Sequence, residues 1–366
     1  FLIIFFFISI YLNQLNYDPR HNGITYLYAD YIRENFLEFP NIYLMYGLLN
    51  SYIDYFSLLL IGDKIFSLIL VTNIFYFICL FLIYYFSQNF LNNRNSFFLT
   101  MILLSIHPVI IFAWHSYKSF FFIVISVTLL QNKNIIYVFI GGIFLSLSGF
   151  LYNLNCVIAL LIFLFFVINF YIYKNKRYIL IISVSYLFPI LVFVLIIFTT
   201  NNLQNFINNI ETNLLFGEIS NGGIINIFIN FLNNTFVEIP KSKIIYNNSY
   251  FIYLTIFIFN IYYSVINLSK FIKGNLKDTK ENVIYSLSVL SLIVSIASLH
   301  SVEIFRLLPS LSLGLIVLLY FLSKKQGNLI IISIVLYSIS SLIFPYLSSS
   351  SILYAKIKEI NKEQIV

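Results

Sequence analysis

Residues 65–87 read IFSLILVTNIFYFICLFLIYYFS and contain no charged side chain. As an α-helix this stretch would be about 35 Å long, because each residue adds about 1.5 Å along the helix axis. The hydrocarbon core of a membrane is about 30 Å thick. Residues 65–87 therefore predict a membrane-spanning helix, and similar apolar runs recur along the whole chain. The pattern predicts an all-α fold, that of a polytopic helical membrane protein.

The composition agrees with this prediction and excludes several soluble classes. Of the 366 residues, 60% are apolar and 10% are charged, whereas an ordinary soluble domain has about 25% charged residues. Cys79 and Cys156 both lie in apolar runs, which argues against a disulfide framework or a zinc site. The chain has no Gly-rich phosphate loop, G-x-S-x-G elbow or H-E-x-x-H pair, so soluble catalytic templates are excluded.

We predict about eleven spanning helices in one integral-membrane domain, residues 1–366. The run Phe1–Leu12 is too short for a full span, so we expect the start of the first helix to lie outside this sequence. The other predicted spans are 65–87, 96–114, 119–131, 135–152, 154–173, 178–199, 251–268, 283–299, 308–323 and 328–347. Two long connections, 13–64 and 200–250, interrupt them.

The positions of Lys and Arg predict the orientation. Eleven of the 21 basic residues but only two of the 14 acids fall in one set of connections, near 88–95, 132–134, 174–177, 269–282 and 324–327. Cytoplasmic loops are rich in Lys and Arg, so this set is assigned to the cytoplasm, and the net charge of +7 does not indicate nucleic-acid binding. Segments 13–64 and 200–250 then lie on the outer face of the inner (cytoplasmic) membrane.

The first outer loop, 13–64, holds six of the 14 acids. We predict a turn at 17–23, where Pro19 and Gly23 suit turn conformations, and then two interfacial amphipathic helices, near 24–36 and 43–61. The predicted apolar face of the first helix is Ile24, Leu27, Tyr28, Tyr31 and Ile32. The loop either holds an aspartate at the membrane surface to act on a lipid-delivered substrate, or it is a solvated loop whose acids avoid the cytoplasmic side.

The order of residues in this loop resembles a known family. It reads DPRHNG at 18–23, Ala29, MYGLL at 45–49 and IG at 61–62. This is similar to the GT-C superfamily of membrane glycosyltransferases, and more narrowly to bacterial membrane proteins of surface-polysaccharide synthesis with a D-P-H-H-D-G first loop. Arg20, Asn22 and Met45 depart from that pattern, which leaves open a changed specificity or an inactive member.

A second stretch resembles the same group. Residues 301–309 read SVEIFRLLP, where the family pattern is approximately R-x-D-x-x-H-L-L-x-x-L-P. Glu303 falls at the position of the acid and Arg306 at that of the histidine. The orientation, which was assigned from other loops, places 13–64 and 300–307 on one face, together with Trp114-His115-Ser116-Tyr117-Lys118 and with Asn153 and Asn155.

The resemblance implies transfer of a sugar from a polyprenyl-phosphate-linked donor to a glycan or lipid acceptor at the outer (periplasmic) face. A carboxylate must accept the proton of the attacking hydroxyl, and cations must stabilise the leaving phosphate. By match to the family aspartate, Asp18 would be the general base. Arg306 would bind the phosphate, with Glu303 orienting it, although the two could form a self-contained pair at a helix end.

The roles of three further residues stay open. His21 could contact the phosphate or, with Asp18, help to hold a divalent cation, or it could bond only to the backbone. Arg20 is a second candidate for substrate or phosphate binding in the same motif. Lys118 could bind the phosphate or could extend its ammonium to the membrane interface.

Two other functions compete with the glycosyltransferase. A lipid-linked oligosaccharide polymerase would use similar lipid substrates, but such enzymes usually carry their key arginines in outer loops, and here only Arg20, Arg33 and Arg306 fall outside. A flippase or transporter of lipid-linked sugars would place ionisable groups within the spans and inverted repeats in the sequence; here ionisable residues within the spans are almost absent, and we find no inverted repeat.

Overall fold

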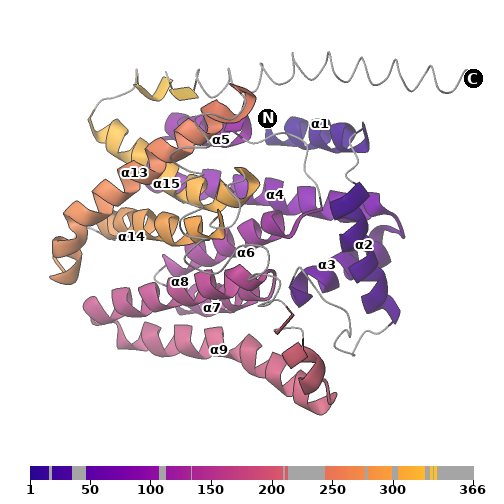
Figure 1. Cartoon of the computed structure of the whole chain (residues 1–366). Helices are drawn as coiled ribbons and strands as arrows, with labels where there is room; N and C mark the ends of the chain where they lie inside the picture. Colours follow the sequence, from indigo (N-terminus) through magenta and orange to yellow (C-terminus); the bar gives the residue numbers. More distant parts are fainter. Residues whose placement is uncertain are drawn as a thin grey trace, which may run out of the picture.

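The computed structural model describes residues 1–15, 19–34, 47–106, 113–132, 134–208, 211–212, 244–276, 279–298, 304–325, 330–332 and 334–335. Within these ranges the regular elements are all helices (Figure 1). They are α1 (Leu2–Leu15), α2 (Pro19–Glu34), α3 (Leu48–Ile61), α4 (Ile65–Ser87), α5 (Asn93–Ile106), α6 (His115–Leu130), α7 (Ile135–Gly149), α8 (Asn153–Ile172), α9 (Lys176–Thr199), α13 (Ile244–Ile272), α14 (Thr279–Val294), the 3₁₀ turn η2 (Ser295–Ser298) and α15 (Ile304–Lys324).

Six helices in the described part of the chain are long and apolar enough to cross a membrane, so the protein is a membrane protein. They comprise Ile65–Ser87, Leu154–Ile172, Lys176–Thr199, Ile252–Ile272, Lys280–Ala297 and Arg306–Lys324. Helices α6 and α7 are apolar but have only 16 and 15 residues, about 24 Å or less. The expected all-α membrane fold is confirmed, whereas the count of about eleven spans is not.

The boundary between α5 and α6 differs from the sequence prediction. The predicted span 96–114 is wrong at its end, because Ala113 and Trp114 are not helical. Trp114 is the N-cap of α6 in an extended conformation, with φ −93° and ψ 141°. Helix α6 therefore begins at His115, four residues before the predicted 119. This shift places His115, Ser116 and Lys118 in the first turn of a helix.

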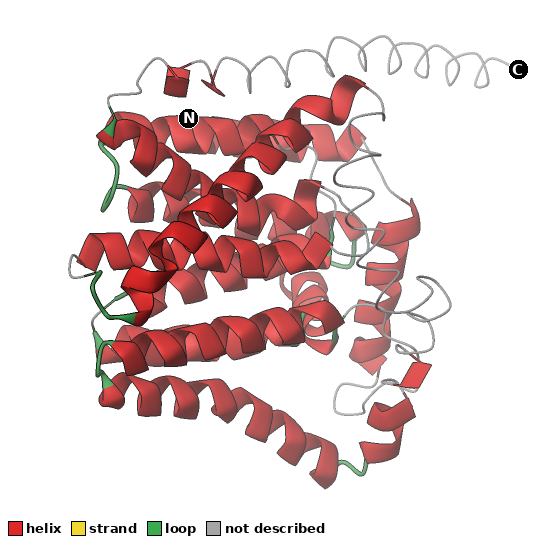
Figure 2. Cartoon of the chain, turned by 60° about the vertical axis from the view of Figure 1, so that its left-hand side comes forward, coloured by secondary structure: helices red, strands yellow, loops and turns green. Residues whose placement is uncertain are grey.

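The connections gather at two opposite ends of the bundle, and Figure 2 shows many of them as green loops on one side. One end, which we call the basic end, brings together the turns after α6, α8 and α13. There the Tyr173 hydroxyl donates to the carbonyl of Leu276 at 3.5 Å, and Lys324 lies 3.4 Å from Glu281. The other end, which we call the loop end, carries α2 and α3. The grouping predicted from Lys and Arg is confirmed for these connections.

Helix α2 runs steeply across the ends of the longer helices (Figures 1 and 2), and it corrects one prediction. It begins at Pro19, so the residues from 19 to 23 form a helical turn in place of the predicted loop turn. Proline suits a first helical position, since the N–H that it lacks would have no partner there. The buried stripe is Asn22, Thr25, Ala29 and Ile32, whereas Leu27, on the predicted apolar face of an interfacial helix, is 64% exposed.

Helix α3 buries its polar side and exposes its apolar side. Its buried residues are mainly polar: Asn50, Ser51, Asp54, Ser57 and Leu58. Leu60, by contrast, is 81% exposed. Because lipid solvates apolar side chains, a helix beside a membrane can turn its polar face toward the protein. Helix α3 starts at Leu48, so the prediction of a helix from about residue 43 reaches beyond the described residues.

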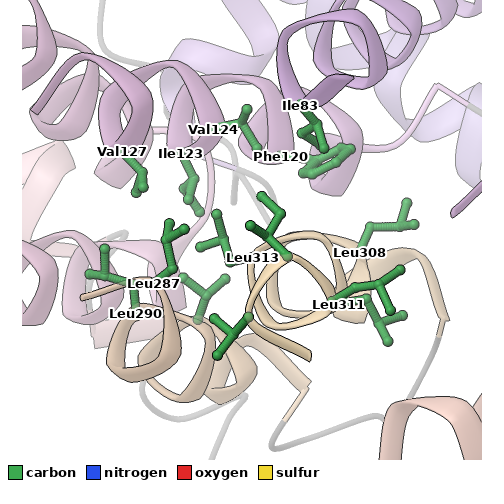
Figure 3. Close-up of a cluster of buried hydrophobic side chains, with 14 of the residues drawn as sticks. Ile83, Phe120, Ile123, Val124, Val127, Leu287, Leu290, Leu308, Leu311 and Leu313 are labelled. Carbon is green, nitrogen blue, oxygen red and sulfur yellow. The ribbon is translucent and has the colours of Figure 1, made fainter. Parts of the chain in front are cut away.

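The main core lies between two groups of helices from opposite halves of the chain (Figure 3). Ile83 of α4 and Phe120, Ile123, Val124 and Val127 of α6 face Leu287 and Leu290 of α14 and Leu308, Leu311 and Leu313 of α15. Helix α15 is the most enclosed of the candidate spans, with 78% of its apolar window buried. The core therefore fixes the start of α15 against the start of α6.

Gly314 provides a test of this packing. A Cβ atom at Gly314 would lie 2.6 Å from Asn260 Nδ2, Ile256 Cγ2 and Ser291 Oγ. We expect Gly314→Ala to lower the stability by about 1–3 kcal/mol through overpacking, measured as a fall in the thermal unfolding midpoint in detergent. Gly23→Ala is the matched control, because a Cβ at Gly23 meets nothing within 4 Å; it should leave the midpoint unchanged or raise it. An equal fall for both variants would contradict the packing.

Candidate functional site

A small cavity with several polar side chains in its lining, which we call the polar cleft, lies at the loop end, where helices distant in sequence meet; its volume is about 20 Å³. It is lined by His115, Ser116, Ser119, Ile123, Tyr152, Asn155, Val294, Ala297, Arg306 and Pro309. These residues come from the N-terminal parts of α6 and α15, from the start of α8 with its N-cap Tyr152, and from the segment where α14 passes into η2. The core contacts in Figure 3 hold α6, α14 and α15 together directly behind this cleft.

Three helix N-termini and one arginine give the cleft a positive potential. The first turn of a helix presents unpaired N–H groups and about half a positive charge. Here α6, α8 and α15 all begin at the cleft, while the α14–η2 segment contributes only the apolar Val294 and Ala297. Arg306, which is partly buried in the first turn of α15, adds a full charge and up to five donors. These groups have the chemistry of an anion site, and the space between them, about 20 Å³, has room for about one water molecule.

Histidine and amide side chains complete the polar wall. The ring of His115 stacks on Tyr152 with centroids 4.4 Å apart and an interplanar angle of 30°. Asn155 Nδ2 donates to Ser119 Oγ at 2.6 Å, which joins the starts of α8 and α6. His115 is only 3% exposed. These contacts hold the imidazole ring and the Ser119 hydroxyl in fixed positions along the cleft.

The first turn of α2 is attached to the same region. Asn22 Oδ1 accepts a hydrogen bond from the backbone N–H of Ala113 at 3.2 Å, and Ala113 lies two residues before His115. Asn22 is completely buried. Because Pro19 and Asn22 are three residues apart in one helix, they are about 4.5 Å apart along its axis. Pro19, which follows Asp18 in the sequence, therefore lies one helical turn from Asn22, and Asn22 contacts the segment that leads into the cleft.

The start of α3 is attached to the turn between α7 and α8. The N–H of Gly47 donates to the carbonyl of Leu151, and that of Leu49 donates to the carbonyl of Phe150, both at 3.1 Å. A Cβ at Gly47 would overlap the carbonyl oxygen of Phe150, so only glycine allows this close approach. The same turn continues into Tyr152, which stacks on His115.

The structure locates some of the predicted site residues. Arg306 lines the cleft. Arg20 and His21 belong to the first turn of α2, but their side chains, like the whole of Asp18 and Glu303, lie outside the described residues. The roles of these four residues therefore stay predictions.

Lys118 does not extend to the membrane interface as one alternative had it, because it is fully buried. Its ammonium forms an ion pair with Asp54 Oδ1 of α3 and donates to Asn50 Oδ1 at 2.9 Å. Asn50 Nδ2 in turn donates to Asp54 Oδ2 at 3.0 Å. The three side chains form a closed triangle between α3 and α6. The prediction that the acids of the first loop could all be solvated is wrong for Asp54, which is 0% exposed.

Sequence reasoning singled out neither Asn50 nor Asp54. Their i, i+4 spacing within an apolar helix is a signal, because it places the amide and the carboxylate on one face. The residue that this face contacts, Lys118, is however 64 positions from Asp54 in the sequence, so the sequence alone does not connect them. His115 was placed only at an outer helix end, and its position beside Arg306 depends on the packing of α6 against α15.

The described residues do not form a metal site. Among them, no group of three His, Cys, Asp or Glu side chains comes close enough to hold an ion. Asp18 and the side chain of His21, the predicted ligands, lie outside the described residues.

An apolar groove lies beside the polar cleft. It has a volume of about 450 Å³ and lies between α3, α7 and α9. Its lining includes Leu48 and Tyr52 of α3, Phe150 at the end of α7, and Pro189 and Phe193 of α9. Phe150 lines the groove and Tyr152 lines the cleft, so only the turn after α7 separates the two.

The comparisons with known proteins show a fold. The sequence matches no family model, and it matches no characterised protein. The structure is similar to the crystal structure of the Archaeoglobus fulgidus oligosaccharyltransferase complexed with zinc and sulfate, with a TM-score of 0.57 and 14% sequence identity. The match covers 93% of this chain and 52% of that chain, so this chain spans about half the length of its neighbour. At this identity the similarity shows a shared fold. It supports the resemblance drawn from the sequence at the level of the fold and does not test the D-P-H-H-D-G loop.

The buried triangle predicts a double-mutant cycle. Lys118→Met alone and Asp54→Leu alone each leave an uncompensated buried charge, and each should lower stability by about 3–5 kcal/mol. The double variant Asp54→Leu/Lys118→Met removes both charges and should recover most of this loss. Thermal unfolding in detergent measures all three. Additive losses in the double variant would mean that the two charges do not stabilise each other.

An exposed network joins α2 to the turn between α3 and α4. Asp63 accepts a hydrogen bond from the Tyr26 hydroxyl at 2.5 Å and another from Arg33 Nη1 at 2.9 Å; Arg33 also pairs with Asp30. These two donors hold the pKa of Asp63 below its ordinary value of 3.8. The same hydrogen bonds raise the pKa values of Tyr26 and Arg33, because the carboxylate of Asp63 favours the protonated form of each donor.

The network predicts a pH dependence for the attachment of α2. Since the pKa of Asp63 is lowered by folding, its stabilising effect is present above its unfolded pKa and is lost as the pH falls through the folded value. We expect the protection of α2 amides against hydrogen exchange, corrected for intrinsic rates, to fall below about pH 4. Asp63→Asn should show the reduced protection already at pH 7. Unchanged protection in that variant would show that the network does not hold α2.

Proposed function

We propose that this protein is a membrane glycosyltransferase that moves a sugar from a polyprenyl-phosphate-linked donor to a glycan or lipid acceptor. The observation that carries the proposal is the polar cleft, where the N-termini of α6, α8 and α15 meet beside Arg306 and His115. It lies at the same end of the bundle as the first turn of α2, which follows Asp18. The fold shared with an oligosaccharyltransferase supports glycosyl transfer in general.

The cleft would stabilise the leaving phosphate. In glycosyl transfer the sugar becomes oxocarbenium-like while negative charge grows on the leaving oxygen. Arg306 would form charge-assisted hydrogen bonds to the phosphate oxygens, and the helix N-termini would add N–H donors and partial positive charge. Lys118 is enclosed by Asp54 and Asn50, so we assign it to holding α3 against α6 and not to the phosphate.

Asp18 would act as the general base. It would accept the proton of the acceptor hydroxyl as that oxygen attacks the anomeric carbon, and the phosphate would leave with the electrons of the broken bond. Asn22 lies one helical turn from Pro19, the residue that follows Asp18 in the sequence, and is hydrogen-bonded to the segment leading to His115. His21 and Arg20 belong to that same turn and would contact the phosphate or the sugar.

The apolar groove would hold part of the isoprenoid chain of the donor. Its lining is almost entirely hydrocarbon, and the turn at Phe150–Tyr152 separates it from the cleft. A lipid-linked sugar requires an apolar channel and an anion site at one membrane surface. We place this surface at the outer (periplasmic) face of the inner membrane, since the basic connections lie at the opposite end.

The structurally similar oligosaccharyltransferase was crystallised with zinc. In this chain, Asp18 and His21 would be the ligands of a divalent cation if one takes part. No described carboxylate or imidazole cluster would hold it. The sugar-transfer step above is assigned to side chains of this chain alone.

The first test is transfer of labelled sugar from a polyprenyl-phosphate donor pool in membranes that contain equal amounts of each variant. Asp18→Asn should reduce transfer at least a hundredfold, since general base catalysis contributes about 10²–10⁴-fold. Arg306→Gln should reduce it strongly too, and should raise the KM for the donor, because it removes charge-assisted hydrogen bonds to the phosphate.

Arg94→Gln is the matched control for Arg306→Gln. Arg94 lies in the first turn of α5, over the ring of Phe98 at 5.3 Å, and does not line the cleft. The Arg94→Gln variant should transfer sugar at the rate of the unaltered protein. Full activity of Asp18→Asn would remove Asp18 from catalysis. Donor binding without transfer by any form would favour a flippase of lipid-linked sugars.

A further inference from the structure

A second polar pocket lies at the basic end, on the opposite side of the molecule from the cleft. It has a volume of about 420 Å³ and is enclosed by the turns after α6, α8 and α13 together with the start of α14. Amide and tyrosine side chains line one part of it: Gln131, Asn132, Asn169, Asn175, Asn282, Tyr173 and Tyr178. Apolar side chains line the rest: Leu130, Phe170, Leu276 and Val283. The proposed transfer chemistry uses none of these residues.

Two buried polar atoms in the lining have no hydrogen-bond partner among the described residues: Gln131 Nε2 and Asn282 Oδ1. The other amide atom of Asn282, Nδ2, donates to Asn169 Oδ1 at 3.3 Å, and Asn169 Nδ2 donates to Ser286 Oγ at 3.3 Å. An unsatisfied buried donor or acceptor costs about 1–3 kcal/mol. One donor and one acceptor that remain unsatisfied in one pocket therefore point to a polar ligand that supplies both partners.

Exposed cations are adjacent in sequence to residues that line the pocket. Lys174, Lys176 and Arg177 are close in sequence to the lining residues Tyr173, Asn175 and Tyr178, and Lys273 precedes the lining residue Gly274. All four are exposed, and none forms an ion pair within the described part of the chain. The pocket thus combines positive charge at its rim, amide groups inside and apolar walls between transmembrane helices.

We propose that this pocket binds the phosphodiester headgroup of an anionic phospholipid with headgroup hydroxyls. The cations would attract the phosphodiester, Gln131 Nε2 would donate to one of its oxygens, and Asn282 Oδ1 would accept from a headgroup hydroxyl. The apolar walls would contact the first carbons of the acyl chains. A free phosphate compound shares the anion chemistry but has nothing to place against Leu130, Phe170, Leu276 and Val283.

The test measures lipid binding to the full chain in phosphatidylcholine nanodiscs that contain increasing phosphatidylglycerol, by native mass spectrometry. We expect discrete binding of phosphatidylglycerol to the unaltered protein. Gln131→Leu/Asn282→Leu should weaken this binding at least tenfold. Lys174→Gln/Arg177→Gln, which changes only exposed residues and leaves folding intact, should weaken it to a similar extent.

Lys64→Gln/Arg94→Gln is the matched control, because it removes two exposed positive charges from residues that do not line the pocket. It should change the affinity less than twofold. An equal loss in this control would overturn the site, because binding would then follow overall charge. Competition by sn-glycerol 3-phosphate at equal concentration would overturn the lipid assignment in favour of a soluble phosphate compound.

Discussion

The ion pair between Lys118 and Asp54 is the constraint on which the loop end of this protein depends. Both side chains are fully buried, and two such charges are tolerated only when each neutralises the other and their remaining hydrogen bonds are made. Asn50 makes those bonds. The pair determines the rotation of α3 about its axis, so the polar face of α3 meets α6 and its apolar face lines the groove beside α7 and α9.

The cleft follows from that arrangement. Lys118 lies one helical turn from His115, so anchoring it to α3 also holds the first turn of α6 in place, where α8 and α15 begin. The core between α4, α6, α14 and α15 fixes Arg306 opposite His115. The fold therefore brings the few charged and polar groups of the loop end together at one place.

Local signals in the sequence predicted the architecture well. Apolar runs gave the helices, and Lys and Arg in the connections grouped most of those connections at the correct end, because both signals depend on the membrane and not on particular partners. The features that the sequence did not predict are those that depend on which other part of the protein a helix contacts. The sequence did not predict that the polar residues Asn22 and Thr25 of α2 are buried, since their burial depends on contact with the rest of the protein. The helix count differs because short apolar helices such as α7 are ambiguous from sequence.

The sequence by itself determined that this is an all-helical membrane protein, that two sets of connections lie at opposite ends, and that Arg306 belongs to the end that carries the first loop. Only the tertiary structure decided that Lys118 forms an ion pair with Asp54 and that His115 and Arg306 line the same cleft. It also decided that two amide atoms without hydrogen-bond partners line one pocket at the basic end. Hydrophobicity is a property of each residue and is readable in order along the chain. Charge neutralisation and anion binding depend instead on groups that only packing brings together, such as Asp54 and Lys118, 64 residues apart.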